Sequence, residues 1–224
     1  MTATEMWLLL AFVVAAVLLF ARATHKKFSV REITIIGLMA ALSFIAYEFF
    51  RIPNVLGTGS SFHLGNTFTA LTALLLDGVS GGLAGAIGLA LADVAAGDAG
   101  YAITTFLLKF IIGLVCGAVA HKVLHLHQQD AAKMSKLRYV GLVTAASFSG
   151  LLVNVFTDPF LGYFRNRFIF GMEADITMVF AKVASGVTLV NSILSCICCV
   201  ILYLAIYPAL KKARLLPEQH KAKL

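Results

Sequence analysis

Between residues 64 and 117, a long apolar stretch carries three charged residues at what should be one membrane surface. Asp93, Asp98 and Lys109 lie there among leucine, isoleucine, alanine and glycine residues. A charged side chain inside a bilayer costs several kcal/mol, so it usually marks a polar cavity or a paired charge. Thr105 precedes Lys109 by four residues and Tyr101 precedes it by eight, so the three side chains form one stripe on a helix. The pattern predicts a polar site that contains Lys109.

A second pair of polar residues has the same helical spacing. Asn154 and Asp158 are four residues apart within a later apolar segment, which places them on one helix face. Two interpretations of the charges remain open. In the first, Asp93 or Asp158 pairs with Lys109 only to stabilise the bundle. In the second, such a pair also forms part of the wall of a pocket.

The composition excludes a soluble globular domain. The 224 residues are 60% hydrophobic and 13% charged, and their mean hydropathy is +0.90. So little polar surface could not cover a soluble core of this size. The apolar runs are continuous rather than alternating, which predicts an all-α membrane bundle.

Seven apolar segments are candidates for membrane spans, which need about 20 residues each. They cover residues 6–21, 31–50, 62–77, 80–96, 101–123, 139–160 and 178–207. The third and fourth are short and should form a tight helical hairpin around Asp77. No basic residue precedes the first, so we interpret it as an extra anchoring helix rather than a signal peptide. We expect this helix and a basic linker at 1–30, a six-helix membrane domain at 31–210, and a basic cytoplasmic tail at 211–224.

Basic residues predict which side of the membrane each connection faces, because cytoplasmic connections carry an excess of lysine and arginine. Thirteen of them fall in alternate connections and can all be cytoplasmic: Arg22, Lys26, Lys27, Arg31, Lys122, Lys133, Lys136, Arg138, Lys211, Lys212, Arg214, Lys221 and Lys223. Arg51, Arg165 and Arg167 would lie on the outer side. The N-terminus is therefore predicted outside and the C-terminus inside. The net charge of +7 reflects this bias and does not indicate nucleic-acid binding.

Small and hydroxylated residues predict how the helices pack. One face of the fourth segment is built from small residues, which let helices approach closely in lipid: Gly81, Gly85, Gly88 and Ala92. The last segment has a polar face that favours hydrogen bonds between helices over contact with a ligand: Thr188, Asn191, Ser192 and Ser195.

The sequence contains no convincing enzyme signature. Ser149 and Gly150 resemble part of an intramembrane serine protease site, but no histidine in another segment could act as the base. His121, His125 and His127 could offer two imidazoles to a metal. They lie at a basic helix end, which favours a solvated interfacial face. There is no Walker A sequence, so the chain does not itself bind ATP by that route. With no enzyme or metal motif retained, we expect no catalytic residue, no metal site and no cofactor.

One block of the sequence is specific enough to suggest a family. It begins with Leu-Gly at 64–65, passes through a glycine-rich hairpin to a G-x-x-L-A-D helix end at Asp93, and closes with T-x-x-x-K at Lys109. This block resembles the substrate-binding S components of energy-coupling factor (ECF) vitamin transporters, especially the riboflavin-transporter-like branch. The resemblance covers about residues 31–210, so the first segment lies outside it.

The resemblance implies a function in micronutrient uptake across a bacterial cell membrane. An S component is a multi-pass subunit that binds a vitamin or related small molecule near the outer surface with high affinity. A transmembrane coupling subunit and two ATPase subunits drive its delivery. Small residues on the first core helix contact the coupling subunit, and Gly37, Ala40 and Ala41 match that surface here. The alternative is an integral-membrane scaffold or a membrane-embedded enzyme without a transport role.

Ten residues are predicted to bind the substrate, at the outer helix ends and in the connection at 51–63: Tyr47, Asn54, Phe62, His63, Asn66, Asp93, Tyr101, Lys109, Asn154 and Asp158. Lys109 would donate to an anionic or carbonyl group, and the acidic and amide side chains would exchange hydrogen bonds. The aromatic side chains would stack on a ring or cover it, as in pockets that combine an apolar wall with a few placed polar groups. Riboflavin, another vitamin and a modified nucleobase precursor all fit this description.

Overall fold

The computed structural model describes residues 27–54, 60–129 and 133–216. Six α-helices lie in these ranges: α2 (Val30–Glu48), α3 (Asn66–Leu75), α4 (Gly78–Ala95), α5 (Ala102–Gly117), α6 (Lys136–Phe164) and α7 (Ala174–Lys212). Five segments built on α2, α4, α5, α6 and α7 are long and apolar enough to cross a membrane. The predicted all-α membrane fold is confirmed. The segment predicted at 6–21 lies outside the described residues.

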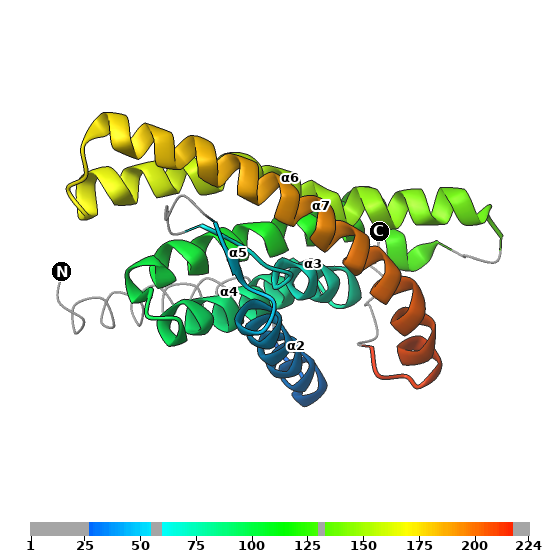
Figure 1. The fold of residues 1–224 in the computed structure, drawn as a ribbon. Coiled ribbons are helices and arrows are strands. Elements are labelled where there is room, and N and C mark those ends of the chain that lie inside the picture. Colours follow the sequence, from blue (N-terminus) through cyan, green and yellow to red (C-terminus); the bar gives the residue numbers. More distant parts are fainter. Residues whose placement is uncertain (1–26, 55–59, 130–132, 217–224) are drawn as a thin grey trace.

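The helices form a bundle with one long pair at its edge. Figure 1 shows α6 and α7 side by side; α3 and α5 pack against this pair, and α4 packs against α3 and α5. Helix α2 packs against α3 and α4. Short elements join the helices: strands β1 (Ile52–Pro53) and β2 (Ser61–Phe62), 3-10 turns η1 (Ala99–Tyr101) and η3 (Leu126–Gln128), and π-helical turns η2 (Ala118–Val123) and η4 (Arg165–Ile169). The two strands pair antiparallel between α2 and α3.

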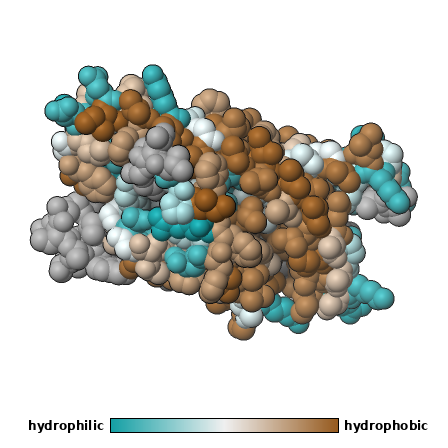
Figure 2. Space-filling view, viewed as in Figure 1, coloured by the Kyte–Doolittle hydropathy of each residue, from teal (hydrophilic) through white to brown (hydrophobic). Residues whose placement is uncertain are grey.

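Apolar side chains dominate the outside of the bundle. Phe156 and Phe168 are 70% and 71% exposed, and large aliphatic residues of α2 and α7 are exposed as well. Figure 2 shows apolar residues over most of one face, interrupted by a hydrophilic patch on the left of the view. Lipid tolerates such a surface and water does not. The chain is a multi-pass membrane protein.

Side-chain caps explain where two of the helices begin. Glu32 N donates to Ser29 Oγ over 3.2 Å, and Ser29 N donates to Glu32 Oε2 over 2.8 Å. This reciprocal capping box starts α2. Asp77 Oδ1 accepts from Val79 N and Ser80 N at 2.9 and 3.0 Å and so starts α4. Because α3 ends at Leu75, the predicted tight hairpin around Asp77 is confirmed.

The third predicted span is shorter than its apolar run suggested. Residues 62–77 were expected to be helical, but α3 has 10 residues, or about 15 Å at the rise of an α-helix. That length covers about half of the hydrocarbon core of a bilayer. Almost all of its residues are buried, from Asn66 to Leu75. Its apolar composition reflects burial within the protein and not contact with lipid.

Glycine residues bring α4 against α2, α3 and α5, as predicted. A Cβ atom at Gly113 would overlap the backbone nitrogen of Gly82. One at Gly85 would overlap the Thr69 side chain, and one at Gly88 would overlap the carbonyl oxygen of Ala40. The helices approach this closely only because no side chain stands between them.

Two histidines bind the carboxyl end of α3. His121 Nε2 donates to Ala73 O over 2.8 Å, and His127 Nε2 donates to Leu74 O over 2.7 Å. These carbonyl groups belong to the last turn of α3, where no helical partner is available. The two imidazoles are half-buried and only His125 is exposed. The prediction of a solvated face for all three was wrong, because the sequence does not show that α3 ends beside them.

Candidate substrate-binding site

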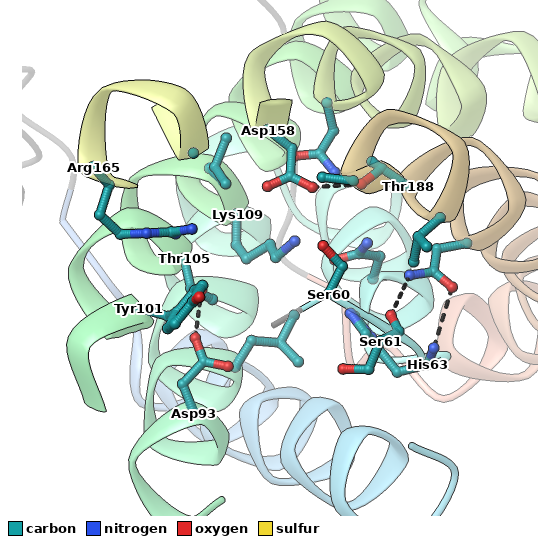
Figure 3. A pocket seen from close by; sticks show the side chains of 18 of the residues that line it. Ser60, Ser61, His63, Asp93, Tyr101, Thr105, Lys109, Asp158, Arg165 and Thr188 are labelled. Atoms are coloured by element: carbon teal, nitrogen blue, oxygen red, sulfur yellow. Dashed lines mark hydrogen bonds between the residues drawn. The ribbon is translucent and has the colours of Figure 1, made fainter. Parts of the chain in front are cut away.

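A polar cavity lies where several helix ends meet. Its volume is about 90 Å³, and α2, α3, α4, α5, α6, α7 and β2 all contribute to its lining. Eight of the ten predicted residues line it: Tyr47, His63, Asn66, Asp93, Tyr101, Lys109, Asn154 and Asp158. Figure 3 shows side chains from these separate elements pointing toward one another.

Lys109 presents an ammonium group to this cavity without a partner from the described chain. Its side chain is only 7% exposed. Neither Asp93 nor Asp158 forms an ion pair with it within 4.0 Å. Instead, the Thr105 hydroxyl donates to Asp93 and the Thr188 hydroxyl donates to Asp158. The structure therefore does not support the interpretation of Lys109 as one half of a tight structural ion pair.

Buried amide groups in the same lining also lack partners. Within the described ranges, Asn154 Oδ1 and Nδ2 have no hydrogen-bond partner, and neither has Asn66 Oδ1. Both side chains are 1% exposed. A buried polar group without a hydrogen bond costs about 1–3 kcal/mol. Unpartnered polar atoms also occur elsewhere in the bundle, but these three line a cavity, where a ligand could satisfy them.

Arg165 is the main functional candidate that the sequence analysis missed. It was assigned to an outer connection, but it starts the π-helical turn η4 and is 9% exposed. Its guanidinium carbon lies 3.8 Å from the centre of the Tyr101 ring, which is cation–π geometry. The i, i+4 pattern of Asn154 and Asp158 continues to Gly162 and Asn166, which also line the cavity. Extending that pattern past the apolar segment would have found this end of α6.

Strand β2 and the residues beside it form one side of the cavity. Arg51 Nη2 lies 2.7 Å from Asp98 Oδ2, and Arg51 Nε donates to Ser61 Oγ over 3.1 Å. Asn191 Nδ2 donates to Ser61 O over 2.9 Å, and its Oδ1 accepts from His63 N at 3.2 Å. Ser61 of β2 is thus bonded to Asn191 of α7 and to Arg51, and Arg51 in turn pairs with Asp98 in the α4–α5 connection. Burial, with the nearby positive charges of Lys109 and Arg51, lowers the pKa of His63 to about 3, so its imidazole is neutral.

Two of the ten predicted residues do not line the cavity. Ser61 faces it and is buried, so its neighbour Phe62 points to the other side of the strand. Asn54 also lies outside the lining, where its side chain donates to Ser60 O. The sequence predicted an irregular loop in this connection. The structure instead has two paired strands, and this pairing determines which side chains face the cavity. Ser60, Ser61, Thr188 and Asn191 are lining residues that the prediction did not include.

The polar face of α7 combines two roles. Ser192 Oγ donates to Leu151 O over 3.0 Å, as expected for a bond between helices. Thr188 and Asn191 also form hydrogen bonds to other elements, but they line the cavity as well. The prediction that this face forms hydrogen bonds between helices rather than contacting a ligand was therefore only half correct.

Comparison with known families agrees with this geometry. The family model of the ECF-type riboflavin transporter, S component, matches residues 27–208. The chain belongs to this S-component family. No curated protein and no solved structure matches it. As an S component, the chain is the substrate-binding subunit of a transporter, and the family is not one of enzymes.

Proposed function

We propose that this S component captures a small organic micronutrient in the cavity around Lys109 and delivers it with an ATP-driven coupling module. The observation that carries the proposal is the Lys109 ammonium group, which is nine-tenths buried, faces the cavity and has no partner among the described residues. A buried charge is expensive without a partner. A ligand acceptor would supply that partner.

The surrounding groups have complementary roles in this proposal. Asn154 can both donate to and accept from the ligand, and Asn66 Oδ1 can accept. Asp93 and Asp158 are held in place by threonine hydroxyls and keep further acceptor capacity. Tyr47 and Tyr101 add aromatic rings to the lining, where they can contact a ligand ring. The ligand would be fixed by hydrogen bonds from several helices.

The orientation of the chain follows from the positive-inside rule. The cavity lies at the ends of α2 and α4, before the start of α5 and beside the end of α6. Basic residues cluster at the other ends of these helices, for example Lys136 and Arg138 at the start of α6 and Lys211 at the end of α7. We therefore place the cavity on the outer side and the C-terminus in the cytoplasm.

The exposed face of α2 is proposed to contact the coupling subunit, which would act with two ATPase subunits. Gly37 and Ala41 are exposed, and no atom lies within 4 Å of a Cβ built on Gly37. Ala40, the third residue assigned to this contact, is 7% exposed and its carbonyl packs against Gly88. Ala40 is therefore removed from the proposed surface, because the helix turns it toward α4.

Ligand release from the purified protein tests the capture role. The full chain is purified from its native membrane, denatured, and the released small molecules are identified by mass spectrometry. We expect a compound from the wild type and from Lys182→Met, because Lys182 is an exposed lysine outside the cavity lining. Lys109→Met should lose it, since a hydrogen bond to a charged group contributes about 1.5–3 kcal/mol.

The same preparations test whether coupling occurs. An epitope-tagged chain should recover a transmembrane protein and ATPases from the native membrane. Absence of a released compound in both wild type and Lys182→Met, with no ATPase recovered, would favour a scaffold and contradict the proposal. Thermal unfolding of each variant in detergent shows whether Lys109→Met is folded.

A further inference from the structure

The cavity is small for a transporter of multi-ring vitamins. Its volume is about 90 Å³, whereas pockets for drug-sized ligands have roughly 300–1,000 Å³. An engineered cavity of about 150 Å³ in another protein holds a single benzene. The cavity is open on one side, so substituents of a ligand can extend toward the surface. Its interior has room for about one ring.

The walls that limit this volume are held in place on both sides of the mouth. On one side, Arg51 bonds to Asp98 and Ser61, and Asn191 bonds to β2. On the other, Arg165 lies 3.8 Å from the Tyr101 ring centre and 5.8 Å from that of Phe170. Enlarging the cavity for a second or third fused ring would break an ion pair or separate these stacked groups. The size limit is therefore part of the site's construction.

The unsatisfied groups of the lining define the polar edge of the ligand. Lys109 offers hydrogen-bond donors to the cavity, Asn66 Oδ1 lacks a donor, and Asn154 lacks one of each. Three helices, α3, α5 and α6, carry these groups, so the complementary atoms must be spread around a compact ligand. A ring with nitrogen atoms and with hydroxyl or amino substituents has this distribution, and a hydrocarbon ring does not.

The charges of the lining are balanced without a ligand. Lys109 and Arg165 are cationic, and Asp93 and Asp158 are carboxylates. The imidazole of His63, which also lines the cavity, is neutral. Arg51 and Asp98 neutralise each other at the mouth. A ligand with a net charge would leave an excess charge in a largely buried site, which is unfavourable.

We infer that, given the capture role proposed above, the ligand is a net-neutral heterocycle of one ring that carries both hydrogen-bond donors and acceptors, and that a three-ring flavin is excluded. The substrate class of this chain therefore differs from the substrate in the printed name of its family.

Ligand identification and calorimetry test this inference together. The compound released from the native-membrane protein is identified by mass spectrometry. The full chain, freed of that compound, is then titrated with it and with four probes: nicotinamide, pyridoxine, phosphorylated pyridoxine and riboflavin. We expect the tightest binder to have one ring and no net charge. Riboflavin should bind at least about 100-fold more weakly, as for a site that rejects a ligand it cannot enclose.

One variant at a further lining residue tests whether cavity size sets the limit. Phe180 lies on α7, lines the cavity and is only half-buried, so Phe180→Ala enlarges the site with little risk to folding. The affinity for riboflavin relative to the one-ring ligand should rise in Phe180→Ala. An unchanged ratio would show that this wall does not select by size and would count against the inference.

The outcomes separate this inference from the proposed function. A released compound with fused rings or a net charge, or riboflavin binding as tightly as any one-ring probe, overturns the inference and leaves substrate capture intact. If no compound is released and no probe binds, both fail. Weaker binding of phosphorylated than of unmodified pyridoxine supports the neutrality of the ligand, and the reverse order contradicts it.

Discussion

The two ends of the bundle differ in how their buried polar groups are used. At the cavity end, Lys109, Asn154 and Asn66 present groups that no described residue satisfies. At the other end, which we call the packed end, His121 and His127 satisfy carbonyl groups of α3. Glycines of α4 and α5 let the backbones touch there. The packed end uses these contacts for stability, although Tyr203 Oη has no hydrogen-bond partner among the residues described there, and the cavity end retains groups that a ligand would satisfy.

This difference predicts that substitutions at the two ends separate stability from binding. At the packed end, a change should lower stability. At the cavity end, loss of a polar group should reduce binding while stability is kept or raised, as expected where function and stability conflict. The predictions below begin with the largest expected effect.

Gly113→Ala should cause the largest loss of stability. Its new methyl group would overlap the backbone of Gly82, which cannot move without separating α4 from α5. Overpacking of this kind costs about 1–3 kcal/mol or more. Thermal unfolding in detergent measures the loss. The control is Gly141→Ala, because nothing lies within 4 Å of a Cβ at Gly141, and it should be neutral or gain about 1 kcal/mol. Equal unfolding temperatures for the two variants would contradict close packing.

Two asparagines provide a matched pair for the cavity end. Asn154→Leu removes polar atoms that have no partner and should raise stability by about 1–3 kcal/mol while it weakens ligand binding. Asn191→Leu removes bonds to Ser61 and His63 and should lower stability by a similar amount. Unfolding curves without ligand measure both effects. A fall in stability for Asn154→Leu would show that its amide already has a structural partner.

Acid should weaken the packed end through His127. Burial, with the nearby charges of His121 and Lys211, lowers the pKa of His127 from 6.5 to about 4. The unfolded chain takes up a proton near pH 6.5 and the folded chain only near pH 4, so this contribution is complete above 6.5 and falls between those values. Unfolding temperatures across this range should be flatter in His127→Gln. The exposed His125→Asn is the control and should retain the wild-type slope; equal slopes in all three would contradict the assignment.

The smallest effect on stability is expected on the exposed face of α2. Gly37→Leu adds a side chain where no atom lies within 4 Å, so folding and ligand release should be unchanged. Recovery of the coupling subunit and ATPases with the tagged chain should fall. Gly141→Leu introduces the same side chain at an equally open site on α6. It should keep normal recovery, and loss in both variants would show that α2 has no special role.

The sequence predicted the core of the site because charge in an apolar segment has few explanations. Asp93, Lys109 and Asp158 could be assigned from helical spacing and the cost of burial, and all three line one cavity. Arg165 was missed because a basic residue just beyond an apolar segment usually faces water. Only the continued turn at the end of α6 brings it inward.

Other predictions were wrong because tertiary contacts, and not composition, determine which side chains are buried. Ala40 and Ala41 are adjacent small residues, and only the position of α4 shows which one is buried. His121 and His127 lie among basic residues, which predicted exposure to water. In the structure they donate hydrogen bonds to carbonyl groups at the end of α3. The strand pairing that turns Ser61 inward and Phe62 away depends on a register that a two-residue strand does not reveal in sequence.

The most direct test of substrate capture is a structure determined with the co-purified ligand. A ligand acceptor should lie within about 3.2 Å of Lys109 Nζ, with the Asn154 amide in hydrogen-bond contact with the same molecule. A ligand bound elsewhere, or Lys109 paired directly with Asp93 or Asp158 while the ligand is present, would contradict it.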